Sequence, residues 1–152
     1  MPSASRSITI NVPAEHLFEL ITDYESYPEF IPETLGVEVL KRTKNKKDGS
    51  RVSEVKFDIK VIKQVDYTLR LTEEPNERVS WELVEGRVFK TNNGSWDLKA
   101  AGKGKVEATY SVEITLGLLV PQAITNMLVG SSLPKMLEQW KDRAESTYKK
   151  KK

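Results

Sequence analysis

Two hydrophobic periods divide the chain, a period of two residues through its middle and a helical period toward its C-terminal end. From Val55 to Val61 apolar residues alternate with charged ones, as in a strand with one buried face. The same alternation recurs in residues 65–71, 79–83 and 106–116, and Trp96 marks another strand. These patterns predict an antiparallel sheet of about six or seven strands.

Helical signals flank the strands. Residues 7–12 alternate as a first strand, and Pro13 suits the first turn of a short helix after it. From Pro121 to Tyr148 apolar residues recur every three or four positions, which predicts a C-terminal helix of about 28 residues and about 42 Å in length. Pro134 predicts a bend in this helix rather than its end.

The segment 23–32 is unusually apolar for a connection. It places four bulky apolar or aromatic side chains and two prolines in ten residues, directly after the first helix. We expect it to fold back as a short second helix or turn that covers an apolar surface. Tyr27, Phe30 and Ile31 are therefore candidates for a lid over a cavity, and equally for a hydrophobic plug over the first helix.

Composition indicates one globular domain, residues 1–148, followed by a solvated lysine tail, 149–152. Without the tail, 20 basic residues stand against 22 acidic ones, which argues against DNA as a partner. The chain has no cysteine, so disulfides, thiol catalysis and zinc–thiolate sites are excluded. It starts without the apolar run of a signal peptide, and we expect a cytoplasmic protein.

A strongly curved sheet closed by a single helix encloses more volume than that helix fills, and the remaining space is where a ligand fits. One face of the predicted strands carries five aromatic residues: Phe57, Tyr67, Trp81, Trp96 and Tyr110. The closing helix presents Met127, Leu128 and Ser131 to the same volume. We predict that these eight residues line a ligand cavity, with plain core packing as the alternative for the aromatic set.

The order of elements and four motifs carry a family resemblance. The motifs are residues 23–32, Gly-Ser-Trp-Asp-Leu at 94–98, Val-Pro at 120–121 and Leu-Pro-Lys-Met-Leu at 133–137. Together they resemble the polyketide cyclase/dehydrase and coenzyme Q-binding family, part of the helix-grip superfamily that also includes START lipid-transfer domains and birch-pollen-allergen-like proteins. The resemblance implies an α+β helix-grip fold, a strongly curved antiparallel sheet wrapped around a long C-terminal helix.

The resemblance also implies a function, the binding or carriage of a lipid-, quinone- or polyketide-like molecule without a cofactor. An aromatic polyketide cyclase or dehydratase is the alternative, and an interaction module of the ribosome-association-toxin type is a second alternative. The coenzyme Q-binding and toxin branches usually carry Pro-Trp-Cys after the aromatic segment. Here Glu33 and Thr34 follow Pro32, which favours the generic cyclase/dehydrase-like branch.

Few residues suit catalysis. His16 is the only histidine, and its position beside the apolar stripe of the first helix predicts a surface residue. No histidine and carboxylate cluster has the spacing of a metal site. If a reaction is catalysed, Glu85, Arg87 and Tyr110 are the candidates for moving protons. Strand alternation places Glu85 on the apolar face, although a position in water beyond the strand end is the favoured interpretation.

The loop 41–47 carries five positive charges in seven residues: Lys41, Arg42, Lys44, Lys46 and Lys47. Such a loop suits transient contact with a membrane surface or an acidic protein. A solvated hairpin tip is the plainer interpretation. The sequence makes no prediction of the oligomeric state.

Overall fold

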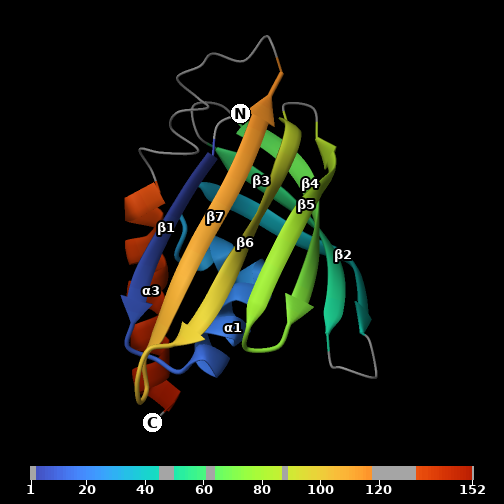
Figure 1. Ribbon diagram of the computed structural model, residues 1–152. Helices are drawn as coiled ribbons and strands as arrows, with labels where there is room; N and C mark the ends of the chain where they lie inside the picture. The colour runs from blue at the N-terminus through green and yellow to red at the C-terminus, as the bar shows by residue number, and fades with distance from the viewer. Residues whose placement is uncertain (1–2, 45–49, 61–63, 87–88, 118–132, 152) are drawn as a thin grey trace.

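The computed structural model describes residues 3–44, 50–60, 64–86, 89–117 and 133–151. In these segments seven antiparallel strands form one curved sheet in the order β1-β7-β6-β5-β4-β3-β2 (Figure 1). The strands are β1 (Ser3–Ile10), β2 (Thr34–Lys44), β3 (Arg51–Lys60), β4 (Gln64–Glu74), β5 (Arg78–Gly86), β6 (Phe89–Ala100) and β7 (Val106–Leu116). The helices are α1 (Ala14–Thr22), the 3-10 helix η1 (Tyr24–Glu29) and α3 (Leu133–Lys151).

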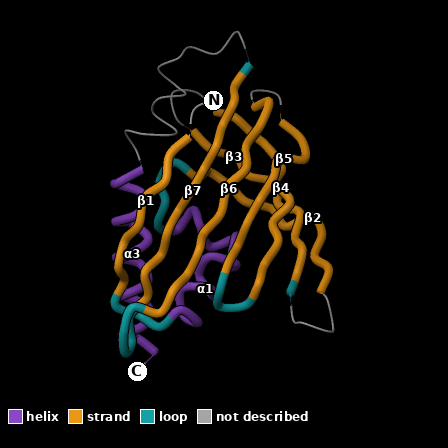
Figure 2. Tube along the Cα trace, in the orientation of Figure 1, coloured by secondary structure: helices purple, strands orange, loops and turns teal. Residues whose placement is uncertain are grey.

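This arrangement confirms the predicted α+β helix-grip fold. The described helices lie together on one side of the sheet, and α3 runs along the edge formed by β1 (Figure 2). The two short helices after the first strand are present as α1 and η1. Residues 121–132 of the predicted C-terminal helix lie outside the described residues.

The alternation of residues along the strands decides which side chains face the helices. In β3 Val55 and Phe57 are buried while Lys56 between them is exposed, and in β4 Leu69 and Leu71 are buried while Arg70 is exposed. The apolar stripe of α3 packs against this face of the sheet, and its residues Leu137 and Trp140 are each 2% exposed. One hydrophobic core therefore joins the sheet, α1 and α3.

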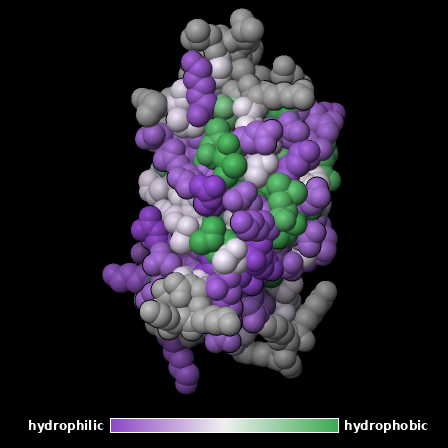
Figure 3. All heavy atoms as spheres, turned by 90° about the vertical axis from the view of Figure 1, so that its right-hand side faces the viewer, coloured by the Kyte–Doolittle hydropathy of each residue, from purple (hydrophilic) through white to green (hydrophobic). Residues whose placement is uncertain are grey.

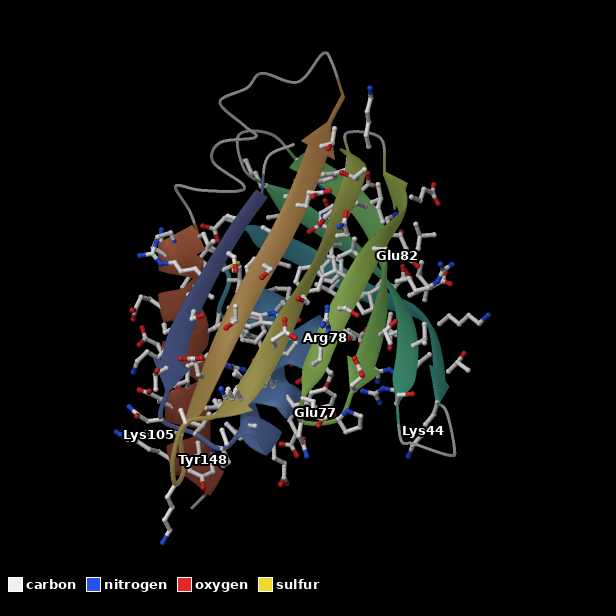
Figure 4. All side chains as sticks on the ribbon, viewed as in Figure 1. Lys44, Glu77, Arg78, Glu82, Lys105 and Tyr148 are labelled. Atoms are coloured by element: carbon white, nitrogen blue, oxygen red, sulfur yellow. The ribbon has the colours of Figure 1, made fainter. Side chains whose placement is uncertain are left out.

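The outer face of the sheet is polar. Arg70 pairs with both Glu54 and Glu82, and Arg78 pairs with Asp97. Figure 4 shows Arg78 and Glu82 on β5, on the side of the sheet away from the helices. On the side of the molecule where β2 lies, hydrophobic side chains form separate groups among hydrophilic ones (Figure 3). Among the described helices, none is long and apolar enough to cross a membrane.

The surface position predicted for His16 is wrong. Its side chain is 5% exposed, and Nε2 lies 3.1 Å from the carbonyl oxygen of Ala144 and 2.9 Å from Oγ1 of Thr147. Its ring also packs on that of Tyr148, with 5.1 Å between the ring centroids. The apolar stripe of α1 faces the sheet, whereas α3 packs against a second side of α1, where His16 lies. The histidine therefore fastens α1 to the C-terminal helix.

The structure departs from strict alternation at the start of β2. Leu35 has the same parity as Val37 and Val39 but is 48% exposed, and the β2–β3 register shifts between Thr34 and Gly36. The first strand also starts earlier than predicted, at Ser3 instead of residue 7, and its pairing with β7 begins there.

Candidate functional site

A cavity of about 320 Å³ lies between the concave face of the sheet, η1 and α3. Side chains of β3 to β7 form most of its described wall. Ile21 of α1, residues of the segment 27–34 and four residues of α3 (Lys135, Met136, Gln139 and Trp140) complete it. A cavity of this size is at the lower end of the range typical for small-molecule sites. Its walls are mostly apolar, which suits a hydrophobic occupant.

All five aromatic residues predicted from strand alternation line this cavity: Phe57, Tyr67, Trp81, Trp96 and Tyr110. Their rings also support one another. Phe57 stacks on Tyr67 with 5.5 Å between ring centroids, and Tyr110 lies 5.0 Å from Trp96 and 5.5 Å from Trp81. The set is thus both core and cavity wall. Ligand binding by these residues stays a prediction.

Gly94 makes room for one wall of the cavity. A Cβ atom at this position would lie 2.2 Å from the carbonyl oxygen of Ser111 and 2.7 Å from the Trp81 ring. The indole of Trp81 is therefore able to lie against β6 only because residue 94 has no side chain. The packing of Trp81 therefore explains the glycine of the Gly-Ser-Trp motif.

The segment proposed as a lid is fastened to α3. Tyr27 and Ile31 line the cavity, whereas Phe30 packs edge-on against Trp140 with 4.8 Å between ring centroids. The guanidinium of Arg143 lies over the Phe30 ring at 5.1 Å and bonds Oε1 of Glu29 at 2.7 Å. Two of the three predicted lid residues thus reach the cavity, and motion of the segment stays a prediction.

The other predicted site residues do not add to the described cavity. Met127, Leu128, Ser131 and Arg87 lie outside the described residues. Glu85 is exposed and is absent from the described lining.

The predicted face of Glu85 was wrong because of a β-bulge. Thr68 pairs with Glu85 but the next residue, Leu69, pairs with Leu83, so one extra residue of β5 shifts the alternation. The favoured interpretation of Glu85 as a residue in water agrees with its exposure.

The polar groups on the sheet side of the cavity include two tyrosine hydroxyls and one amide. Burial raises the pKa values of Tyr110 and Tyr67 well above the ordinary value of tyrosine, with a smaller contribution from Tyr110 to the shift of Tyr67. Asn92 is 6% exposed and accepts a hydrogen bond of 3.3 Å from Nε1 of Trp81. Sequence reasoning missed Asn92, although it shares strand parity with Gly94 and Trp96.

A second feature missed in the sequence is a buried carboxylate on β4, outside the described lining of the cavity. Glu73 is 1% exposed and accepts hydrogen bonds from Arg51 Nε at 2.6 Å, Ser53 Oγ at 2.7 Å and Tyr24 Oη at 2.7 Å. Arg42 extends the cluster, since it donates to Ser53 and to the carbonyl oxygen of Thr22 and lies 5.9 Å from the Tyr24 ring centroid. We call these five side chains the Glu73 cluster. It joins η1 to β3 and β4.

The basic loop is only partly described. Lys41 and Lys44 are exposed at the end of β2, and Lys46 and Lys47 lie outside the described residues. Figure 4 shows Lys44 at the tip of this strand, away from α3. Arg42 is exposed as well, but its guanidinium hydrogen-bonds Ser53 and the carbonyl oxygen of Thr22 and so belongs to the Glu73 cluster. Among the described residues, no group of three metal-ligating side chains is present.

Comparison with protein families gives a match over most of the chain. The family model for polyketide cyclase / dehydrase and lipid transport proteins matches residues 10–141.

Curated relatives of one kind also match. The ribosome association toxin RatA of Escherichia coli is 30% identical over 96 residues, which cover 63% of this chain and 57% of the relative, so the match spans just over half of that protein. RatA of Vibrio cholerae is 27% identical over 137 residues, covering 84% of this chain and 91% of the relative.

Solved structures share the fold at low identity. A START superfamily protein from Mycobacterium smegmatis aligns with a TM-score of 0.81 and 20% identity over 95% of this chain and 98% of that one. The Zhui aromatase/cyclase from Streptomyces sp. R1128 aligns with a TM-score of 0.76 and 16% identity over 94% and 93% of the two chains. At these identities the likeness shows the fold alone.

Proposed function

Because the chain belongs to the polyketide cyclase / dehydrase and lipid transport family, we propose that it binds and carries a small hydrophobic molecule between its sheet and α3. The observation that supports this proposal is the cavity of about 320 Å³, with walls of aromatic and aliphatic side chains. Transfer of an apolar ligand from water into such a space is favourable in proportion to the apolar area that it buries. A lipid-, quinone- or polyketide-like molecule has the required surface.

Native mass spectrometry of the purified protein, followed by organic extraction, tests this proposal. We expect the wild type to carry an extractable hydrophobic molecule and Met136→Trp to lose it. Met136 lies on α3 and lines the cavity, so an indole at this position occupies the space of the ligand. Val84→Trp is the matched control, because Val84 is 41% exposed and is absent from the described lining, and this variant keeps the ligand.

The carrier function fails if the wild type shows only its apo mass and no thermal shift with quinones, fatty acids or aromatic polyketides. Equal ligand content in the wild type and a folded Met136→Trp variant places the ligand elsewhere. Overpacking of a core costs about 1–3 kcal/mol, so the fold of the variant is checked by circular dichroism.

A cyclase or dehydratase is the enzymatic alternative, and the described cavity offers it little acid–base chemistry. General acid–base catalysis works best with groups whose pKa lies near the working pH. Burial moves the pKa of Tyr110 away from neutrality, which makes its hydroxyl a poor proton donor at pH 7. Among the described lining residues, Glu33 is the only carboxylate and Lys135 the only cation. These features favour binding over turnover.

Contact with ribosomes is a second candidate function, favoured by the match to RatA of Vibrio cholerae over 84% of the chain. We expect the protein to co-sediment with ribosomes at low salt and to lose this association when Lys41 and Lys44 are both changed to Gln. Contacts of lysine with phosphate release counterions, so association weakens steeply as salt rises. Lys99→Gln with Lys103→Gln is the control, since both residues are exposed outside β2. Absence of co-sedimentation at low salt would exclude this function.

A further inference from the structure

Asn92 is a buried residue whose amide group makes one hydrogen bond within the described part of the chain. The indole N–H of Trp81 is only a donor, so the amide atom that faces it at 3.3 Å is the oxygen, Oδ1. The amino group of Asn92 then remains with two donor hydrogens. It has no partner among the residues described, although Asn92 is 6% exposed and lines the cavity. The amino nitrogen is not among the fully buried unpaired atoms of the described residues, so it is accessible to a molecule in the cavity.

Two phenol groups of the same cavity are in the same situation. Within the described part of the chain, the hydroxyls of Tyr67 and Tyr110 have no hydrogen-bond partner. Each ring is held on two sides. Tyr67 lies between Phe57 and Phe89, with centroid distances of 5.5 and 4.9 Å. Tyr110 likewise lies between Trp81 and Trp96, so packing fixes both hydroxyls in place.

We infer that Asn92, Tyr67 and Tyr110 form a donor subsite that binds the carbonyl oxygen of a neutral hydrophobic ligand. This inference rests on the proposed binding function and specifies the ligand class. The three groups line one cavity, and Asn92 is joined to Tyr110 through Trp81, which contacts both. The amino group of Asn92 can only donate, and a carbonyl oxygen, with two lone pairs, is the acceptor that satisfies such groups. A pure hydrocarbon would leave all three donors without partners, which costs binding energy.

The surroundings favour a neutral ligand over an anion. An isolated charge is costly to bury unless a counter-charge accompanies it. Lys135 is the only cation in the described lining, and it lies on α3, opposite the sheet that carries the three donors. Burial also raises the pKa values of both tyrosines, so the same environment disfavours negative charge on their own hydroxyls. Ketones, quinones and esters fit these conditions, whereas carboxylates do not.

Two probes of nearly equal shape test the subsite. Benzophenone carries one carbonyl group, and diphenylmethane has a methylene group in its place. We expect wild-type protein to bind benzophenone about tenfold more tightly in equilibrium dialysis. In the double variant Tyr67→Phe/Tyr110→Phe this preference falls to about threefold, because benzophenone keeps only the Asn92 amino group as a donor while the affinity for diphenylmethane stays the same. Tyr148→Phe is the matched control, since Tyr148 packs on His16 and is not part of the described lining.

The outcomes separate the subsite from the carrier function. Equal binding of both probes to the wild type, or an undiminished preference in the double variant, overturns the subsite and leaves the carrier function intact. Failure of both probes to bind overturns both. Tighter binding of diphenylacetate than of benzophenone overturns the neutral ligand class. Ultraviolet irradiation of bound benzophenone supplies an independent readout, because the photolabel must appear on residues that line the cavity.

Discussion

Replacing Glu73 by Ala lowers the free energy of unfolding by about 3–5 kcal/mol. The carboxylate is 1% exposed and accepts three hydrogen bonds, from Arg51, Ser53 and Tyr24. Its removal leaves the buried donors of Ser53 and Tyr24 without an acceptor and the partly buried Arg51 without its counter-charge. Removal of one partner from a buried ion pair lowers the stability much more than the loss of an exposed ion pair, which contributes about 0–1 kcal/mol.

Urea unfolding followed by circular dichroism measures this change. Small domains have total stabilities of about 5–15 kcal/mol, so the variant retains a folded state only if the wild type lies well within that range. Glu74→Ala is the matched control. Glu74 is the next residue of β4 and is exposed, and surface changes of this kind usually fall within about 0.5 kcal/mol.

Tyr24→Phe separates the hydrogen bond from the charge. It removes one donor to Glu73 while the aromatic ring stays in the core, and we expect a loss of about 1–2 kcal/mol. A Glu73→Ala variant that is no less stable than Glu74→Ala would show that the cluster does not hold η1 to the sheet.

Local alternation predicted the cavity wall because each side chain of a strand points to one of only two faces of the sheet. Phe57, Tyr67 and Tyr110 share parity with the aliphatic residues around them, so one correct assignment of the apolar face placed them all. The same reasoning applied to polar residues would have found Glu73, which is two positions after Leu71. It would equally have found Asn92, two positions before Gly94. Both were missed because polar residues were expected in water.

The burial or exposure of other residues depends on long-range contacts, which a local sequence pattern does not show. The bulge in β5 reverses the predicted face of Glu85, and a register shift at the start of β2 exposes Leu35. Both irregularities arise from pairing between strands, so the alternation within one strand cannot show them. His16 is buried only because α3 lies against α1, more than a hundred residues later in the chain.

The presence of a cavity follows from the sheet and helix together. Aromatic side chains of the strands form one wall, and α3 contributes Trp140 and Met136 to the opposite wall. The sequence predicts which side chains meet there. The volume left between them depends on the curvature of the sheet, which long-range pairing determines.

Alkaline solution unfolds this protein over a narrow pH range above 10. Burial is the main cause that raises the pKa values of four tyrosines above the ordinary value of 10.0: Tyr24, Tyr27, Tyr67 and Tyr110. Below pH 10 both the native and the unfolded chain keep these protons, and the stability is complete. Above pH 10 the unfolded chain releases them while the native protein retains them, so the native state binds more protons and its stability falls as the pH rises.

We expect the free energy of unfolding to fall steeply with pH above 10. Each retained proton lowers the free energy of unfolding by about 1.4 kcal/mol per pH unit, and four such groups together by about 5 kcal/mol per pH unit. Urea unfolding at a series of pH values between 9 and 11.5 measures the slope, and tyrosinate absorbance rises together with the loss of structure. In Tyr110→Phe one titrating group is absent, so its slope is smaller by about a quarter. Titration of all four of these tyrosines near pH 10, in a protein that keeps its circular dichroism, would contradict their burial. It would also contradict the proposed donor subsite, to which Tyr67 and Tyr110 belong.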